Sequence, residues 1–363
     1  MARFVNEQNY AHETPQRVGV LLTNLGTPAS PTPGDVRRYL AEFLSDPRVV
    51  EVPRLVWLAI LHGVVLRTRP KRSAEAYEKV WGIDGSPLLR IGLQQRDALA
   101  PVLREKLGMD CDVELAMRYG EPSIANVMDK MRQNNVRRLL VLPLYPQYSA
   151  TTTAATIDEV TRVLRRWRWL PEIRTINQYH DENGYIGALA ASVNQYREQN
   201  GAGEKLLFSF HGIPKRNLLS GDPYHCQCRK TARLCADMLG LNDDQWALSF
   251  QSRLGKAEWL RPYTDQVLEQ WGSEGVGQVD VLCPGFSADC LETLEEVALG
   301  YAELFEEKGG GALRYIPALN DAPSHIDFLA DLAVRNLNGW IGTPQLNALD
   351  ATRERAIALG AER

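Results

Sequence analysis

The sequence has few cysteines and no long apolar run, and each shortage excludes a class of protein. Six cysteines are scattered over 363 residues, too few for a disulfide framework, which favours a reducing compartment. The N-terminal segment lacks an apolar stretch followed by a small-residue cleavage pattern, so we expect a cytoplasmic protein. The longest apolar segment, residues 55–66, is about 12 residues long, whereas a bilayer span needs about 20.

A strong excess of charge of either sign is also lacking. The chain has 41 basic and 45 acidic residues and a net charge of −4, so its overall field gives no reason to expect nucleic acid as a partner. The hydrophobic content of 44% is enough for a large core, and the length favours two domains.

Short apolar runs that are typical of strands alternate with longer amphipathic segments. Such runs begin at Val18, Val113, Arg138, Lys205, Trp246 and Val279. They are apolar on both faces, as strands of a buried parallel sheet are. The intervening segment TIDEVTRVLRRW has apolar residues at helical spacing. The alternation predicts an α/β fold with doubly wound, Rossmann-like layers.

The strands fall into two groups separated by a long helical stretch. We predict an N-terminal lobe over residues 1–160 and a C-terminal lobe over residues 161–311, with residues 312–363 packed back on the N-terminal lobe. Ligands of such sheets bind outside the carboxyl ends of the strands. We therefore expect the functional residues where strands end, in a cleft between the lobes.

One histidine stands at such a strand end, in the motif SFHGIP. The imidazole of His211 could act as a general base, because its reference pKa of about 6.5 lies near neutrality. The structural alternative is a turn histidine held by a backbone carbonyl. Position alone leaves both interpretations open.

Two acidic residues lie four positions apart in CPGFSADCLETLEEV. The segment predicts a helix that begins near Ser287 and carries Glu292 and Glu296 on one face. An exposed acidic face near a helix N-terminus is one interpretation. If the face instead turns into a cleft, burial would raise the pKa of one carboxyl group, and the pair could relay protons or bind a hard divalent cation.

An apolar segment with basic neighbours predicts a lip at the entrance of the cleft. The residues expected in this lip are Leu55, Trp57, Leu58, Leu61 and Leu66, with Arg67, Arg69, Lys71 and Arg72 at the rim. Such a surface suits a flat apolar ligand that bears carboxylates, or an anionic membrane face. The motif TNLGTP has neither a three-glycine dinucleotide fingerprint nor a Gly-Lys-Ser/Thr loop.

Three cysteines lie close together in CQCRKTARLC. Cys226, Cys228 and Cys235 could supply most ligands of an iron–sulfur cluster, but such a cluster ordinarily needs four, and no fourth ligand is evident nearby. Structural thiols are the simpler interpretation. We therefore expect no required cofactor, and these cysteines are the sole candidates for a cluster.

Several motifs in order resemble the ferrochelatase family, whose members insert ferrous iron into protoporphyrin IX to form protohaem at the end of haem biosynthesis. These motifs are LLFSFHGIPKRNLLSGDPY, YPQYS, FQSRLGKAEWLRP and CPGFSADCLETLEE, and the similarity extends from Val18 to Asp321. The resemblance implies two Rossmann-like lobes with the porphyrin in the cleft between them, and iron as a substrate.

The resemblance also implies roles for single residues. His211 would take part in pyrrole proton abstraction and metal handling, and Glu292 would face it across the macrocycle, so both are expected to be catalytic and to contact the metal. Glu296 would be a proton or metal relay. Binding energy from the porphyrin edge would bend the ring, at a strain of about 1–5 kcal/mol. The positions that match the family's porphyrin pocket are Leu25, Tyr77, Arg118, Tyr119, Tyr145, Ser149, Trp259 and Phe286.

Three positions depart from the family pattern. Cys290 stands where many relatives have histidine, so a second imidazole is not expected, and Gly300 replaces the third member of an acidic stripe. Ala150 stands where animal enzymes have a cluster cysteine, and no cysteine follows Cys290. The resemblance therefore excludes the two-iron cluster of the animal enzymes.

Two functions are alternatives to a protoporphyrin ferrochelatase. One is a chelatase for coproporphyrin or cobalt, and the other is a non-catalytic carrier of haem or another tetrapyrrole. Leu25 favours protoporphyrin, because the coproporphyrin branch tends to have tyrosine there. Glu292 favours an enzyme, because a carrier needs no carboxylate opposite the histidine. The expected partners are thus protoporphyrin IX, ferrous iron and, through the lip, weak contact with the inner membrane. Both a monomer and a homodimer fit the sequence.

Overall fold

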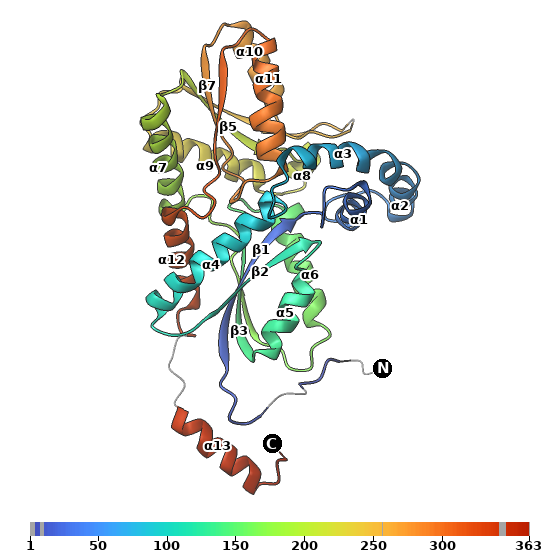
Figure 1. The fold of residues 1–363 in the computed structure, drawn as a ribbon, viewed down its shortest axis with the longest axis vertical. Coiled ribbons are helices and arrows are strands. Elements are labelled where there is room, and N and C mark those ends of the chain that lie inside the picture. The colour runs from blue at the N-terminus through green and yellow to red at the C-terminus, as the bar shows by residue number, and fades with distance from the viewer. Residues whose placement is uncertain (1–3, 8–10, 256, 341–345, 363) are drawn as a thin grey trace.

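Two parallel sheets of four strands each form the framework of the molecule and lie one above the other along its long axis (Figure 1). The computed structural model describes residues 4–7, 11–255, 257–340 and 346–362. Helices cover the sheets, so the prediction of an α/β fold with two Rossmann-like lobes is confirmed.

The first sheet has the strand order β2-β1-β3-β4. Its strands are β1 (Arg17–Gly26), β2 (Asp112–Tyr119), β3 (Val136–Pro143) and β4 (Glu172–Thr175). β1 is a central strand that pairs with β2 on one side and β3 on the other, and it is buried on both faces because helices cover the sheet. The helices of this part of the chain are α1 (Pro33–Leu44), α2 (Arg54–Ile60), α3 (Leu66–Val80), α4 (Pro87–Leu107), α5 (Ile124–Gln133) and α6 (Ala155–Leu164).

The second sheet repeats this topology with the order β6-β5-β7-β8. Its strands are β5 (Lys205–His211), β6 (Trp246–Gln251), β7 (Gln278–Leu282) and β8 (Ala312–Ile316). The remaining α-helices are α7 (Asn183–Asn200), α8 (Lys215–Leu219), α9 (Tyr224–Met238), α10 (Thr264–Ser273), α11 (Ala302–Glu307), α12 (Pro323–Leu337) and α13 (Leu346–Ala358). Three π-helical segments are η1 (Leu61–Val65), η2 (Ala150–Ala154) and η3 (Glu292–Tyr301).

The predicted limits at residues 160 and 312 do not coincide with the division of strands between the sheets. β4 lies beyond residue 160 but pairs with β3, so the first sheet continues to Thr175. β8 lies within residues 312–363 but pairs with β7 and belongs to the second sheet. Both are short edge strands without a long apolar run, which is why the sequence pattern did not reveal them. After β8 the chain returns, and α12 packs against α4 and β3.

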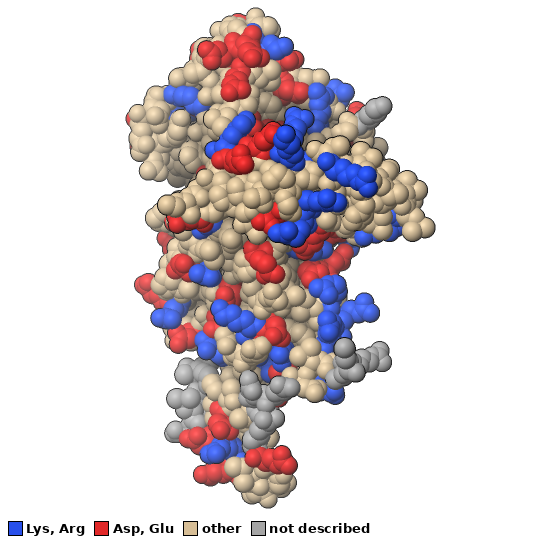
Figure 2. Space-filling model, turned by 45° about the vertical axis from the view of Figure 1, so that its right-hand side comes forward, with Lys and Arg blue, Asp and Glu red and all other residues tan. Residues whose placement is uncertain are grey.

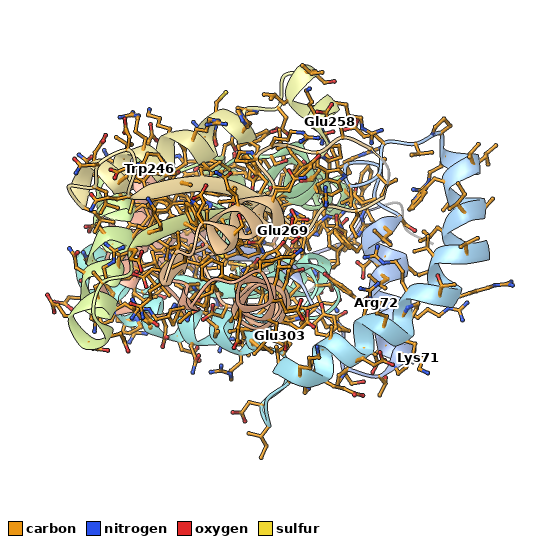
Figure 3. All side chains as sticks on the ribbon, turned by 90° about the horizontal axis from the view of Figure 1, so that it is seen from above. Lys71, Arg72, Trp246, Glu258, Glu269 and Glu303 are labelled. Carbon is orange, nitrogen blue, oxygen red and sulfur yellow. The ribbon has the colours of Figure 1, made fainter. Side chains whose placement is uncertain are left out.

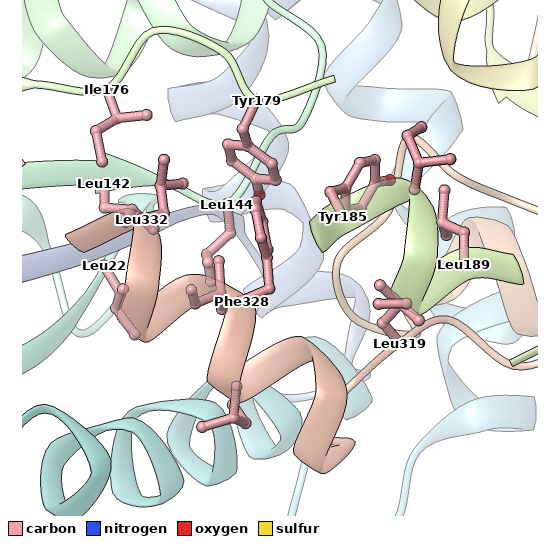
Figure 4. Close-up of a cluster of buried hydrophobic side chains, with 14 of the residues drawn as sticks. Leu22, Leu142, Leu144, Ile176, Tyr179, Tyr185, Leu189, Leu319, Phe328 and Leu332 are labelled. Atoms are coloured by element: carbon pink, nitrogen blue, oxygen red, sulfur yellow. The ribbon is translucent and has the colours of Figure 1, made fainter. Parts of the chain in front are cut away.

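One hydrophobic core runs through both lobes. It joins Leu22 of the first sheet to Phe208 and Phe210 of the second. Figure 4 shows the part of this core where α12 lies beside the first sheet. There the ring centroid of Tyr179 lies 5.5 Å from that of Tyr185 and 5.6 Å from that of Phe328, distances typical of favourable aromatic pairs. The two lobes therefore form one packed body.

A buried charge cluster ties the second sheet to its flanking segments. Asp280 of β7 is fully buried, and its carboxylate accepts hydrogen bonds from Arg197 Nε, Arg314 Nε and the backbone N–H of Gly203, each at 2.9 Å. The cluster compensates the buried charge only while all its partners are present.

We predict that Asp280→Ala lowers the free energy of unfolding by about 3–5 kcal/mol, because it leaves two guanidinium groups near the core without their anion. Denaturant unfolding of the purified protein measures this. The control is Asp237→Ala on α9, which removes the exposed ion pair with Arg233 and should cost no more than about 1 kcal/mol. Equal, small losses in the two variants would show that the Asp280 cluster contributes little.

Candidate functional site

The imidazole of His211 is held at the last position of β5. The residue pairs with Gln251 of β6, and its backbone carbonyl accepts a hydrogen bond from the Tyr224 hydroxyl at 2.9 Å. Nδ1 lies 2.6 Å from the carbonyl oxygen of Gly212. Because a carbonyl can only accept, Nδ1 carries the proton, and in the neutral ring the lone pair is on Nε2. The structure thus combines both interpretations of this histidine: a backbone carbonyl holds the ring, and one nitrogen can still accept a proton.

The acidic pair lies on the π-helix η3, not on an α-helix that begins near Ser287. That prediction was wrong by about one turn, since η3 begins at Glu292. The preceding residues form a loop because Asp289 accepts hydrogen bonds from the Thr293 hydroxyl at 3.1 Å, the Asn320 amide at 2.8 Å and the Tyr315 hydroxyl at 2.6 Å. π-Helical turns are rare and occur frequently at functional sites.

Glu296 connects the acidic pair to the histidine. Burial raises the pKa of its carboxyl group, and the nearby charge of Glu292 adds to this, whereas hydrogen bonds from Ser252 and Tyr301 and the interaction with His211 lower it. Glu292 and Glu296 both lie on η3, and Glu296 accepts a hydrogen bond from Ser252, which directly follows the strand partner of His211, so the structure brings the three predicted residues into one region. They belong to two different strand-end regions, β5 and the segment after β7.

The carboxylate of Glu292 lies among groups that stay protonated. Burial, and then the charge of Glu292, raises the pKa of Tyr77 and of the Cys290 thiol. In Tyr39 burial raises the pKa first, and Glu292 contributes. Cys290 can therefore donate a hydrogen bond to Glu292, but it offers no second base. Sequence reasoning missed Tyr39, which lies on the inner face of α1 and carried no motif.

Arg118 and Tyr119 share a carboxylate that the sequence analysis did not identify. Arg118 forms an ion pair with Asp46, and the Tyr119 hydroxyl donates to the same oxygen at 2.9 Å. Arg118 Nε also donates to the carbonyl of Ala155 at 2.8 Å. The charge of Arg118 is thus compensated within the protein. Asp46 precedes Pro47 in a loop, where an acidic residue gives no distinctive signal.

Ser149 is buried, and Tyr145 is half-buried with a buried hydroxyl group. The Tyr145 hydroxyl has no hydrogen-bond partner among the described residues, and burial raises its pKa. Ser149 donates to Asp222 at 3.0 Å, and this carboxylate also accepts from the backbone N–H of Ala150 at 2.8 Å and of Tyr224 at 3.0 Å. Asp222 therefore fastens the loop after β3 to the second lobe.

Three predicted pocket residues are half-buried apolar side chains. Leu25 and Phe286 pack against a common group that includes Leu88 and Cys290. The ring centroid of Trp259 lies 6.4 Å from that of His211, and its indole N–H donates to the carbonyl of Leu254 at 2.9 Å. Apolar surface thus lies next to both the histidine and the acidic pair.

A separate cavity of about 510 Å³ lies at the carboxyl ends of β1 and β2. Its lining includes Thr27, Tyr39 and Trp81, but neither His211 nor Glu292. Tyr39 belongs both to this lining and to the surroundings of Glu292. The cavity is therefore a neighbour of the site and not its centre.

The lip consists of α2, η1 and α3, which project to one side of the first sheet (Figure 1). The apolar residues predicted for the lip do not all lie at the surface, and Leu58 is half-buried. Leu61 and Leu66 are buried, and the half-buried Trp57 donates its indole N–H to the Leu44 carbonyl at 2.6 Å. Leu55 is 85% exposed, and the other exposed apolar residues of this segment are Val56, Ile60 and Val64. The cause is helical periodicity, which turns one face of the segment inward.

Basic side chains accompany this exposed apolar surface. Arg67, Lys71 and Arg72 are exposed, whereas Arg69 is partly buried, and this burial lowers its pKa. Figure 2 shows Lys and Arg side chains beside an uncharged surface on the projecting part. In Figure 3, Lys71 and Arg72 lie on α3, away from the sheets. No helix within the described part of the chain is long and apolar enough to cross a bilayer.

The three clustered cysteines do not share one helix face, because Cys226 points away from the other two. All lie on α9, where Cys228 and Cys235 are buried and Cys226 is exposed. Residues two positions apart on an α-helix do not share a face. Within the residues that the structure describes, no group of three or more His, Cys, Asp or Glu side chains is arranged to hold a metal ion.

The chain is similar to known proteins over almost its whole length. The family described as ferrochelatase matches residues 17–337. The chain is 55% identical to "Ferrochelatase" of Thioalkalivibrio sulfidiphilus, over 99% of this chain and 100% of the relative. It is 52% identical to "Ferrochelatase" of Aromatoleum aromaticum over the full length of both. Among solved structures, SirB from Bacillus subtilis with Fe³⁺ is 13% identical with a TM-score of 0.51, over 70% of this chain and 92% of that chain. That last similarity concerns the fold alone.

Proposed function

The chain belongs to the ferrochelatase family, and we propose on this premise that it inserts Fe²⁺ into protoporphyrin IX to form protohaem, the last step of haem biosynthesis. The family is one of enzymes that insert iron into porphyrin. The choice of protoporphyrin rests on Leu25, which packs with Phe286 as an apolar wall. An apolar wall suits the vinyl groups of protoporphyrin better than the additional propionates of coproporphyrin, whose charge would lose its hydration there.

The observation that carries the proposed mechanism is the hydrogen bond between His211 Nδ1 and the Gly212 carbonyl. It fixes the ring and its tautomer, so that Nε2 can accept a proton from a pyrrole N–H without reorientation. Two such protons must leave when the metal enters. Glu292 is the second acceptor in this proposal, and Glu296, which interacts with both residues, takes a proton or the metal one step further.

The aromatic and apolar side chains around the site would bind the porphyrin edge. Trp259 packs beside His211, Tyr77 is close enough to Glu292 for its charge to raise the tyrosine pKa, and Phe286 packs against the group that contains Cys290. Binding energy at the edge can be used to bend the macrocycle and expose its nitrogen lone pairs to the metal. Arg118 and Tyr119 would hold their part of the wall in place through Asp46.

We propose that the reaction needs no resident cofactor, and that iron is substrate only. The orientation of Cys226 away from Cys228 and Cys235 supports this. The functional test is direct. Colourless protein, purified without oxygen, is supplied with Fe²⁺ and either protoporphyrin or coproporphyrin, and product is followed by its absorption. We expect faster turnover with protoporphyrin. Preference for coproporphyrin would refute the substrate assignment, and binding of haem without turnover would favour a carrier.

We predict that His211→Ala lowers kcat by about 10²–10⁴-fold, the range expected for loss of a general base, while porphyrin still binds. Glu292→Gln should also lose turnover, because the amide keeps the shape of the side chain but accepts no proton. Porphyrin binding is measured by fluorescence quenching, and turnover under anaerobic conditions. A His211→Ala enzyme within a few-fold of the wild type would eliminate this role, and loss of porphyrin binding in Glu292→Gln would make that residue structural.

We also propose that the lip rests reversibly on the inner membrane face of a cytoplasmic enzyme. Leu55, Val56 and Ile60 offer exposed apolar surface, and Arg67 and Lys71 lie on the next helix. Each basic group near an anionic surface contributes about 1 kcal/mol. Protoporphyrin is nearly insoluble in water, so an apolar entrance at the membrane would shorten its route to the site.

The expected result is weak binding to anionic liposomes that high salt abolishes and that Leu55→Ser or Arg67→Glu reduces several-fold, as measured by co-sedimentation. Trp57 is unsuitable for this test, because its indole holds the Leu44 carbonyl. The matched control is Arg233→Glu on the exposed face of α9, which should leave binding unchanged. If the protein stays in the supernatant even at low salt, the lip does not bind membranes, and its role would be limited to porphyrin entry.

A further inference from the structure

Ser252 donates two hydrogen bonds to the carboxylate of Glu296. Its backbone N–H donates to Oε1 at 2.8 Å, and its hydroxyl donates to Oε2. The residue has a positive φ of 64°, a left-handed conformation that is uncommon for residues other than glycine. The backbone is thus placed in an unfavourable conformation that directs both donors at one side chain.

A third donor completes the arrangement. The Tyr301 hydroxyl donates to Oε1 at 3.0 Å. An ionised carboxylate has about four lone-pair positions, two on each oxygen. The described donors fill both positions of Oε1 and one of Oε2. Glu296 therefore keeps one open acceptor position, on Oε2.

We call the donors from Ser252 and Tyr301 the Glu296 clamp. This clamp also connects Glu296 to His211. Ser252 directly follows Gln251, the residue that pairs with His211, and the Gly212 N–H donates to the Gln251 carbonyl at 2.8 Å. The separation between the imidazole and the carboxylate is therefore set by the pairing of two adjacent strands. Without the bonds to Ser252, the position of the Glu296 side chain relative to His211 would depend on the helix alone.

We propose that Ser252 is a positioning residue that holds Glu296 fixed and restricts it to one bond with the incoming iron. The proposal rests on the proposed function, because it takes Glu296 as a residue that the substrate iron passes. A carboxylate free to turn can bind a divalent cation through both oxygens and would retain it. A carboxylate with one open position holds the metal more weakly and releases it toward the porphyrin.

The charged residues near the Glu296 clamp form ion pairs with other partners. Arg253 pairs with Asp265 at 2.8 Å, and Lys79 of α3 pairs with Glu295 at 2.8 Å. Neither pair donates to Glu296 in the described structure. The positioning role can therefore be separated from them by removing the Ser252 hydroxyl alone.

The test uses Ser252→Ala and Ser252→Gly in the full-length enzyme. Both variants lose the hydroxyl and keep the N–H, but only glycine relieves the positive φ. If the hydroxyl acts as proposed, both lower kcat by about tenfold, in the range for a lost hydrogen bond to a charged group. Both should also lower the KM for Fe²⁺ and leave the KM for protoporphyrin unchanged.

Metal binding gives a readout that does not require turnover. Anaerobic equilibrium dialysis with Fe²⁺ alone should show tighter binding by both Ser252 variants than by the wild type. Tyr301→Phe should act in the same direction, because it frees a position on Oε1. The control is Ser249→Ala on β6, whose hydroxyl pairs with Thr264 at 2.9 Å and does not touch Glu296. It should change neither iron binding nor kcat.

The outcomes separate this proposal from the proposed function. Unchanged kcat and iron affinity in both variants would overturn the role of Ser252. So would a change in Ser252→Ala that Ser252→Gly does not share, since the backbone conformation and not the hydroxyl would then be responsible. Failure of the proposed function would instead be seen as a wild-type enzyme that does not turn over protoporphyrin.

Discussion

The pairing of β5 with β6 is the constraint on which the site depends. It sets His211 beside Gln251, and the residues on either side of that pair hold the imidazole through Gly212 and the carboxylate of Glu296 through Ser252. Backbone hydrogen bonds between two buried strands are among the least deformable contacts in a protein. The groups to which we assign proton transfer are thus attached to neighbouring positions of one strand pair.

Much of the fold could be predicted from periodicity. The buried strands were recognisable because they are apolar on both faces, as β1 is. The edge strands β4 and β8 were not, because half-exposed strands of four or five residues carry little pattern. The lip shows the opposite error: residues 55–66 have a high apolar content, but helical periodicity buries Leu61 and Leu66 and leaves Val56 and Val64 exposed.

The site could be predicted only as far as motifs reach. His211, Glu292 and Glu296 stand in distinctive stretches, and the structure brings them together. Asp46 lies outside these motifs, and its contact with Arg118 joins residues 72 positions apart in the chain. Asp222 stands in the motif LLFSFHGIPKRNLLSGDPY, but its contact with Ser149, 73 positions away, could not be predicted from the motif. Ser252 stands within a recognised motif, but its contact with Glu296 depends on a left-handed backbone conformation. Such a conformation can be predicted from sequence at a glycine, but not at a serine.

The shared core has a consequence for how a large, flat substrate reaches its place. Many two-lobed enzymes open along a hinge, but here the lobes share one core, and Asp222 fastens the loop after β3 to the second lobe. Opening along this boundary would expose apolar surface to water at about 25 cal/mol per Å². On the projecting helix α2, by contrast, the apolar side chains of Leu55 and Val56 already lie at the surface. Access to the site is thus expected at the edge of the shared core and not through separation of the two lobes.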